Sequence, residues 1–586
     1  MSLEESLKKK INLKKKVKRI LLISTIQIHE SKINLVVAKK KRYYAYPPYG
    51  LGILNKLIKE SNYESKILDL NIDTFLHLQN NEVKTTDEIT KFWKKRLKEI
   101  LSIYKPDLIG ITCTFTMNLD PMKDTIKEIK KFDKNIYVVA GGVHVTGDTE
   151  NILKDCPEID FASTHEGEKS FLNFLEYLNT RENFNDLSQL SWIENDKLLK
   201  IKKMDIPTDH FLNVTPDMSD LPLNKLSSIG EIGTFRFYRN KNSIGSAVLS
   251  NKGCRARCSF CSVRQFNGKG VRLKNNETVV DEIKYLNKKY GVDHITWLDD
   301  DLFFDKERTI DLYKKISQLD FKITWDASNG VIASAAVAHP EIMKYAEESG
   351  CIGAYFGLES GSPKILADIH KPSGLKHYYK LGEMMNKSHP KIFTRGFLIV
   401  GFPKETISDL FQTIEMAKKV QLDWYTSAVL LPLPNTEIYD DMPETNVFEE
   451  EDKNRPGWLG KRISDENSGL LDGKGYTDYY KLVKENPDKI LTEEDIVHMW
   501  YVTDYEINYK PIFNITDENK LRKKIKFLED VSTRITENNP LAYYFWGLSL
   551  KKIGKRNGDK IIEKSKALLA KNKGWQKRFE TLNLEV

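Results

Sequence analysis

Short apolar runs alternate with amphipathic stretches along the first third of the chain. Each run has the length of one strand, and lysine-rich stretches with helical spacing of apolar residues, such as 50–58 and 122–132, lie between runs. The predicted strands are 19–24, 65–70, 107–112, 136–140 and 159–162. This alternation is typical of a parallel sheet covered by helices on both faces, so we predict an open α/β domain over residues 17–180.

A second series of short apolar runs occupies residues 244–440. The predicted strands are 248–250, 293–298, 323–328, 354–358, 394–400 and 428–431. Amphipathic stretches typical of helices lie between them, at 279–290, 305–319, 339–349 and 407–419. Six strands with intervening helices predict a partial (βα)6 barrel, a fold that binds its ligands at the carboxyl ends of the strands.

The remaining segments lack this alternation. Residues 181–243 are predicted to be an irregular linker with a small hairpin near 190–201. Residues 441–586 are predicted to form a helical C-terminal cap, in which one helix begins after Thr492 and two short helices flank Gly554. The predicted fold class is therefore α/β: a Rossmann-like open parallel sheet, then a partial barrel, then helices.

Composition and charge narrow the class of protein. With 40% hydrophobic and 10% aromatic residues, the chain can fill more than one core. Residues 1–19 hold eight Lys and Arg against two Glu, which is +6 of the net +8, so the body is nearly neutral. We predict that residues 1–16 are a solvated basic tail, and we do not expect a nucleic-acid partner. No apolar run is long enough to span a bilayer, so we expect a cytoplasmic protein without membrane insertion.

Three of the six cysteines, Cys254, Cys258 and Cys261, lie within eight residues. Iron-sulfur clusters and structural zinc sites usually take four protein ligands, so three thiolates leave one metal position open for a substrate or cofactor. A zinc site completed by a distant His or Cys is the alternative. The cysteines that we expect to be buried packing residues are Cys113, Cys156 and Cys351.

The string Cys254-Arg-Ala-Arg-Cys258-Ser-Phe260-Cys261 resembles the motif of radical S-adenosylmethionine enzymes. The resemblance implies a 4Fe-4S cluster whose open iron chelates S-adenosylmethionine and whose electron cleaves it to a 5'-deoxyadenosyl radical. It also implies an electron donor such as flavodoxin or ferredoxin. By resemblance to the family's strand ends, the S-adenosylmethionine contacts are Phe260, Asp299, Asp300, Ser328, Glu359, Ser360 and Arg395. Metal binding by the aspartates is a competing interpretation.

Three loops in the first domain, Pro47-Pro48-Tyr49-Gly50, Gly141-Gly142-Val143-His144 and Glu166-Gly167-Glu168, resemble the cobalamin-binding domain that precedes many radical S-adenosylmethionine enzymes. The cobalamin contacts that this resemblance implies are Pro48, Tyr49, Gly50, Thr112, Gly141, Gly142, His144, Glu166 and Gly167. The string Asp-x-His-x-x-Gly, which marks a histidine ligand to cobalt, is absent from the sequence. His144 is therefore expected to be a loop residue, or else a turn histidine bound to backbone.

The two resemblances together imply a cobalamin-dependent radical S-adenosylmethionine enzyme of the class B methyltransferase type. Its expected reaction is methylation of a carbon atom in a small-molecule or lipid substrate. Radical rearrangement or cyclisation with the same cofactors is one alternative, and modification of tRNA is another, suggested by the basic tail. The sequence assigns no catalytic side chain beyond the cofactor contacts.

Overall fold

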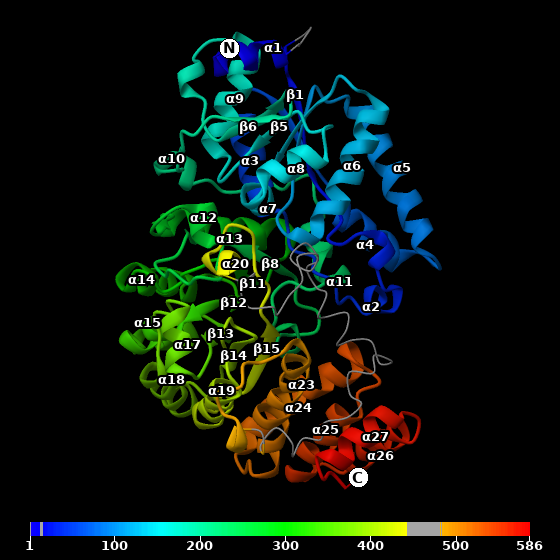
Figure 1. Ribbon diagram of the computed structural model, residues 1–586, viewed down its shortest axis with the longest axis vertical. Coiled ribbons are helices and arrows are strands. Elements are labelled where there is room, and N and C mark those ends of the chain that lie inside the picture. The colour runs from blue at the N-terminus through cyan, green and yellow to red at the C-terminus, as the bar shows by residue number, and fades with distance from the viewer. Residues whose placement is uncertain (1, 12–15, 442–480, 482, 586) are drawn as a thin grey trace. The chain divides into compact units, whose positions relative to one another are not determined.

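The computed structural model describes residues 2–11, 16–441, 481 and 483–585 (Figure 1). The described residues divide into two compact units. The first unit falls within Met1–Ile232, Ser243–Arg255 and Ser262–Asp299, and the second falls within Gly233–Asn242, Ala256–Cys261 and Asp300–Val586. Among the described helices, none is long and apolar enough to cross a membrane.

The first unit is built on a seven-stranded sheet of order β2-β1-β3-β4-β5-β6-β7. The strands are β1 (Arg19–Ser24), β2 (Glu64–Asp69), β3 (Leu108–Thr112), β4 (Tyr137–Gly141), β5 (Phe161–Ser163), β6 (Leu190–Glu194) and β7 (Lys197–Lys200). The first five are parallel, whereas β6 and β7 form an antiparallel hairpin on β5. The predicted open α/β sheet and hairpin are confirmed, but the hairpin extends the sheet beyond residue 180.

Helices cover both faces of this sheet. They are α2 (Leu35–Lys39), α3 (Tyr49–Glu60), α4 (Leu70–Asn80), α5 (Thr86–Tyr104), α6 (Leu119–Phe132), α7 (Val143–Gly147), α8 (Thr149–Asp155) and α9 (Glu168–Thr180). Figure 1 shows α5 beside α6 on one face and α3 with α9 on the other. Strand β1, which lies between β2 and β3, is consequently buried on both faces, as its continuous apolar run predicts.

The N-terminal segment differs from the solvated tail that its lysines suggest. Residues Leu3–Lys10 form helix α1, which Ser2 caps. Leu7 on this helix is completely buried, and the Ser6 hydroxyl donates to the Glu194 carboxylate at 2.6 Å on strand β6. The prediction was wrong because apolar residues on one face of a short helix can dock while the lysines on the other face stay in water. Residues 12–15 of the tail lie outside the described residues.

Six strands are present in the region of the predicted barrel, and within each unit they pair in parallel in chain order. Strand β8 (Gly245–Val248) ends at residue 248, where the predicted strand 248–250 begins, so that prediction lies three residues too far along the chain. In the first unit β8 (Gly245–Val248) pairs with β11 (His294–Trp297). In the second unit β12 (Thr324–Ile332), β13 (Cys351–Glu359), β14 (Phe393–Val400) and β15 (Trp424–Val429) pair successively.

Strand β15 begins four residues before its predicted start at residue 428. The apolar residues Leu430 and Leu431 lie beyond its end, where Pro432 and Pro434 cannot donate to a strand ladder. Hydropathy alone therefore placed this strand too far along the chain.

Helices alternate with these strands. They are α13 (Asn276–Tyr290), α14 (Lys306–Ser317), α15 (Ala333–Ala338), α16 (Pro340–Glu348), α17 (Pro363–Asp368), α18 (Leu375–Ser388) and α19 (Ile407–Val420). The four predicted helices are confirmed to within a few residues at each end. Helix α18 was not predicted, although Tyr378, Leu381 and Met385 bury one of its faces.

The described C-terminal residues of the second unit are helical, as predicted. The longer helices are α23 (Glu493–Asp504), α24 (Glu518–Asp530), α25 (Pro540–Lys552), α26 (Gly558–Leu569) and α27 (Lys573–Thr581). Thr492 caps α23, and α25 and α26 flank Gly554. Aromatic residues of this region form a core with strand residues, and the ring centroids of Phe527 and Trp424 are 4.4 Å apart. Residues 442–480 of the predicted cap lie outside the described residues.

Candidate functional site

The three clustered cysteines lie on the chain between two short strands, β9 (Asn251–Lys252) and β10 (Arg272–Leu273), which pair antiparallel. All three cysteines are half-buried and form no disulfide within the described residues, whereas Cys113, Cys156 and Cys351 are buried as predicted. Gly253 closes the base of the loop with a φ of +85°, and a Cβ there would lie 2.4 Å from the carbonyl oxygen of Gly270. The loop therefore carries three half-buried cysteines and begins next to this closely packed base.

This donor set fits an iron-sulfur cluster with three protein ligands. Among the residues that the structure describes, no three His, Cys, Asp or Glu side chains could hold one metal ion together. A cubane cluster does not need that convergence, because each cysteine binds a different iron.

A buried cation, Lys371, lies beside two of the cysteines. Burial disfavours its charge, but Glu359 and the thiols of Cys258 and Cys261 raise the pKa of Lys371 above its ordinary value. Burial raises the pKa of the Cys258 thiol, and the Lys371 ammonium partly offsets that effect. Lys371 therefore favours the thiolate form that a metal cluster needs. Nothing in the sequence around Lys371 distinguishes it from the many other lysines, so its role could not be predicted from the sequence.

Glu359 ends strand β13 in a left-handed conformation, with a φ of +64°. Its Oε1 accepts from Lys371 Nζ at 2.7 Å, and a Cβ on Gly357 would lie within 3 Å of both atoms. Its Oε2 is buried and has no hydrogen-bond partner within the described ranges. A buried carboxylate oxygen of this kind costs free energy unless a donor reaches it, so Glu359 fits a ligand that brings hydroxyl groups.

The neighbouring Ser360 has a structural role. Its side chain is fully buried, its hydroxyl lies 3.2 Å from that of Thr413, and it accepts from the amide of Ser362 at 3.1 Å. These contacts fix the turn that follows Glu359. The prediction that Ser360 contacts S-adenosylmethionine stays a prediction.

The carboxylates after strand β11 differ in their surroundings. Asp299 is buried and accepts from the amide of Ser250 at 2.9 Å and from its hydroxyl. Asp300 accepts from the amide group of Asn329 at 3.3 Å. Asp299 thus holds the end of β8, whereas Asp300 follows it at the carboxyl end where a ligand ammonium is predicted.

The other predicted S-adenosylmethionine residues lie on or beside strands of the second unit. Ser328 Oγ accepts from the amide of Thr234 at 2.7 Å. The guanidinium of Arg395 donates to Thr426 Oγ1 at 2.6 Å and lies 4.9 Å from the centre of the Tyr355 ring. The ring of Phe260 lies 6.0 Å from that of Phe402.

Four of the predicted cobalamin contacts meet at the carboxyl ends of β3 and β4. Thr112 pairs with Gly141 in the parallel register. Gly142 has a φ of +108°, and a Cβ there would lie 2.6 Å from the carbonyl oxygen of Cys113 and 2.8 Å from Thr112 Oγ1. Only glycine allows this close approach, which lets the next residue, Val143, begin helix α7.

His144, the fourth of them, lies in helix α7 and not in a loop or turn, so that prediction was wrong. One nitrogen of its ring has no hydrogen-bond partner among the described residues. Its Nδ1 lies 3.3 Å from Thr116 Oγ1, while its Nε2 is buried and meets no hydrogen-bonding atom in the described part of the chain. The exposed side chains of Phe115 and Met117 lie on the preceding loop. A polar atom without a partner beside exposed apolar side chains fits a bound cofactor with both apolar and polar groups.

Burial, with a smaller contribution from Lys123, lowers the pKa of His144 to about 4. An unfolded histidine titrates near 6.5, so its neutral form stabilises the fold above pH 6.5 and that stabilisation is lost as the pH falls toward 4. The maximum effect is on the order of 3 kcal/mol. We expect urea unfolding to show a larger loss of stability between pH 7 and pH 5 in the wild type than in His144→Gln. An equal loss in the two proteins would contradict this.

In the loop before helix α3 and the first residues of the helix, one predicted contact residue binds other protein groups and another borders open space. Tyr49 is buried, and its hydroxyl donates to Glu282 Oε2 at 2.9 Å and accepts from Lys274 Nζ at 3.2 Å. Pro48 is the N-cap of helix α3. A Cβ on Gly50 would meet no atom within 4 Å among the described residues. Gly50 therefore leaves room for a ligand, whereas the Tyr49 side chain is engaged within the protein.

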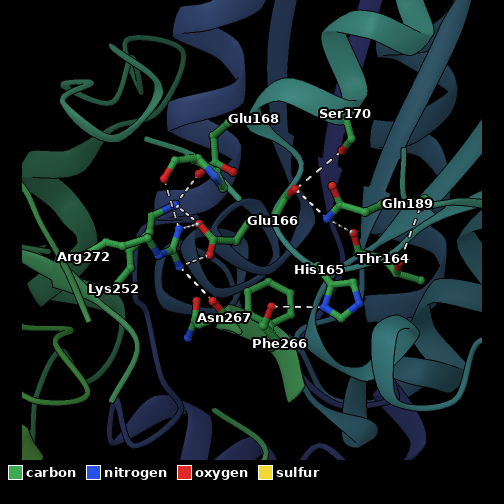
Figure 2. A network of polar contacts seen from close by, with 11 residues as sticks. Thr164, His165, Glu166, Glu168, Ser170, Gln189, Lys252, Phe266, Asn267 and Arg272 are labelled. Atoms are coloured by element: carbon green, nitrogen blue, oxygen red, sulfur yellow. Dashed lines mark hydrogen bonds and ion pairs between the residues drawn. The ribbon is translucent and has the colours of Figure 1, made fainter. Parts of the chain in front are cut away.

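The Glu166-Gly167 loop follows β5. Glu166 is buried, and Lys252 and Arg272 contact its carboxylate (Figure 2). A Cβ on Gly167 would be in ordinary contact with Leu54 at 3.6 Å. Neither cation could be predicted from the sequence, since their partner is distant along the chain.

Comparison with known proteins places these two regions in two families. Residues 248–417 match the Radical SAM superfamily, and residues 35–175 match the B12 binding domain. An uncharacterized methyltransferase of Pyrococcus horikoshii is 30% identical over 438 residues, which are 74% of this chain and 85% of that protein.

Two further proteins are similar over most of the chain. An anaerobic magnesium-protoporphyrin IX monomethyl ester cyclase of Rubrivivax gelatinosus is 22% identical over 73% of this chain and 72% of its own. The solved structure of the cobalamin-dependent S-adenosylmethionine radical enzyme OxsB, with aqua-cobalamin and S-adenosylmethionine bound, has a TM-score of 0.58 at 14% identity. It covers 95% of this chain and 84% of that one, which shows a shared fold.

Proposed function

Because the chain belongs to the cobalamin-dependent radical S-adenosylmethionine enzymes, we propose that it methylates a carbon atom of a small-molecule or lipid substrate. The similarity to a methyltransferase over 85% of that protein's length supports methyl transfer. The observation that carries the proposal is the loop of three half-buried cysteines with Lys371 beside two of them. When bound, the cluster and S-adenosylmethionine supply a carbon-centred radical, and the corrinoid supplies the methyl group.

In this proposal the chain's own residues hold and orient the cofactors. Cys254, Cys258 and Cys261 bind the cluster. Glu359 accepts from the ribose hydroxyls of S-adenosylmethionine through the oxygen that has no partner within the described residues. Lys371 fixes the orientation of that carboxylate by donating to its other oxygen at 2.7 Å.

The remaining predicted contacts complete the assignment. Asp300 would accept from the methionine ammonium, with Phe260, Asp299, Ser328, Ser360 and Arg395 around the same ligand. On the first sheet, the residues proposed to contact cobalamin remain Pro48, Tyr49, Gly50, Thr112, Gly141, Gly142, His144, Glu166 and Gly167. The engaged side chains of Tyr49 and Glu166 would act by holding their loops, since both have protein partners.

We also propose that a flavodoxin or ferredoxin reduces the cluster and that the enzyme works in the cytoplasm. A low-potential one-electron donor is required because cleavage of S-adenosylmethionine consumes one electron. The nearly neutral body does not favour an RNA substrate.

Methyl transfer can be tested before the substrate is known. Protein reconstituted anaerobically with iron, sulfide and hydroxocobalamin should contain about four irons and one corrinoid per chain. With a reductant and methyl-labelled S-adenosylmethionine, we expect label in the corrinoid fraction and formation of 5'-deoxyadenosine. Both products are separated and quantified by liquid chromatography and mass spectrometry.

A radical cyclase with the same cofactors is the second candidate, because the chain is similar to a cyclase over 73% of its length. A cyclase of this kind would form 5'-deoxyadenosine but leave the corrinoid without label. That result would reject methyl transfer and keep the cofactor assignment. Absence of iron in the reconstituted wild-type protein would reject both candidates.

A further inference from the structure

Four charged side chains with little exposure join the loop after β5 to the hairpin that carries the cysteines (Figure 2). Lys252 Nζ donates to Glu166 Oε2 at 2.8 Å and also to Glu168. Arg272 donates to both carboxylate oxygens of Glu166, one of them at 3.1 Å. The two positive charges are equal in number to the two negative ones. Removing one of the four side chains would therefore leave a charge with little exposure uncompensated, which destabilises the fold.

Glu166 is the member that closes the hairpin. Lys252 and Arg272 lie directly opposite each other in the antiparallel register of β9 and β10. Like charges in that position repel, and the carboxylate of Glu166 lies within reach of both. Glu166 therefore holds together strands β9 and β10, which the cysteine loop connects.

The same segment also contacts the far side of the cysteine loop. Helix α12 (Val263–Asn267) follows Cys261, and the carbonyl oxygen of Phe266 lies 3.2 Å from His165 Nδ1. Arg272 Nη2 donates to the carbonyl oxygen of Asn267 at 3.0 Å. The loop is thus held before its first cysteine, at Lys252, and after its last.

The loop that carries Glu166 is itself fixed to the sheet. Gln189, which is buried just before β6, donates to the carbonyl oxygens of Thr164 at 3.1 Å and Glu166 at 3.3 Å. The amide of Thr164 donates back to the carbonyl oxygen of Gln189 at 2.9 Å. Glu166 is consequently anchored to the frame of the first sheet and is not a mobile surface side chain.

We propose that Glu166 is a positioning residue for the iron-sulfur cluster, acting through Lys252 and Arg272 on the conformation of the cysteine loop. It does not touch the cluster, and its charge ties the loop to the sheet whose carboxyl ends are assigned to cobalamin. This inference rests on the proposed function, because it takes Cys254, Cys258 and Cys261 to be the cluster ligands.

The test compares reconstituted Glu166→Gln with wild type. The variant keeps the size of the side chain but leaves Arg272 without its counter-charge. We expect iron loss to a chelator to be about 10- to 100-fold faster, the range typical of groups that orient metal ligands. We also expect a broadened electron paramagnetic resonance spectrum of the reduced cluster, and Glu166→Asp should recover part of both properties. Identical chelation rates and spectra in Glu166→Gln and wild type would overturn the inference.

Two further variants separate positioning from general damage. Glu194→Gln alters a half-buried glutamate of the same sheet, whose partners Ser6 and Lys9 are not on the cysteine loop, and should behave like wild type. If Glu166→Gln does not fold, Glu166→Gln/Arg272→Gln removes one charge of each sign. We expect that double variant to fold and still lose iron faster, whereas wild-type behaviour would overturn the inference. Failure of the wild type to bind iron would instead reject the proposed function.

Discussion

Replacing Cys258 with alanine is expected to abolish reductive cleavage of S-adenosylmethionine. Two remaining thiolates cannot hold a cubane cluster at three corners, so we expect iron content to fall to a small fraction of the wild-type value. Lys371, which lies beside the Cys258 thiol, would keep its pairing with Glu359 and preserve the local fold. Iron analysis, the spectrum of the reduced protein and quantification of 5'-deoxyadenosine measure the effect.

Cys156→Ala is the matched control, because Cys156 is a buried, free cysteine of the first unit. This substitution also removes one thiol, but from a packing position, and should lower the free energy of unfolding by about 1 to 2 kcal/mol. The variant should retain iron and activity. If Cys258→Ala still cleaves S-adenosylmethionine, the cluster assignment is wrong. If both variants lose iron equally, the loss results from impaired folding, and the result contradicts the assignment of Cys258 as a cluster ligand.

Replacing Glu359 with glutamine is expected to weaken S-adenosylmethionine binding by about 10- to 150-fold, because a hydrogen bond to a charged group contributes about 1.5–3 kcal/mol. The change also leaves Lys371 as a buried charge without its carboxylate, which destabilises the fold by about 3–5 kcal/mol. Equilibrium binding of S-adenosylmethionine and urea unfolding of the reconstituted protein measure the two effects separately.

The variant Glu359→Gln/Lys371→Met separates ligand recognition from stability. Removing both buried charges should recover most of the stability lost in Glu359→Gln, since no unpaired charge remains. The affinity for S-adenosylmethionine should stay low, because the carboxylate acceptor is still absent. Wild-type affinity in the double variant would show that Glu359 serves the fold and not the ligand.

Local periodicity predicted most of the fold because most elements are amphipathic over their own length. The helix that begins after Thr492 and the pair around Gly554 were found from caps and spacing alone. Helix α1 was missed because the charge of its lysines outweighed Leu7 in the sequence pattern, although that one buried leucine docks the helix. Strand β15 was misplaced because a strand's limits depend on the register with its neighbour, here β14.

The site residues were also predicted only in part, since local motifs indicated the loops but not the partners of their side chains. Gly142 and Glu359 were singled out from local motifs, and both residues have a positive φ in the structure. Tyr49 and Glu166 were singled out from the same kind of motif, yet their side chains are engaged by Lys274 and Lys252, respectively. A motif identifies where a loop has special geometry but not which atom each side chain reaches.

The sequence by itself determined the cysteine spacing, the succession of strands and helices, and the membership in a radical S-adenosylmethionine and cobalamin-binding family. The signals that carry these features are local, since each motif, strand or helix is recognised from fewer than about 20 consecutive residues. Only the tertiary structure decided that Lys371 neutralises Glu359 beside two cysteines and that Glu166 holds the base of the cysteine loop. Such pairings join residues that are far apart in sequence. They form because folding removes the charges from water, and a buried charge without a partner then costs free energy.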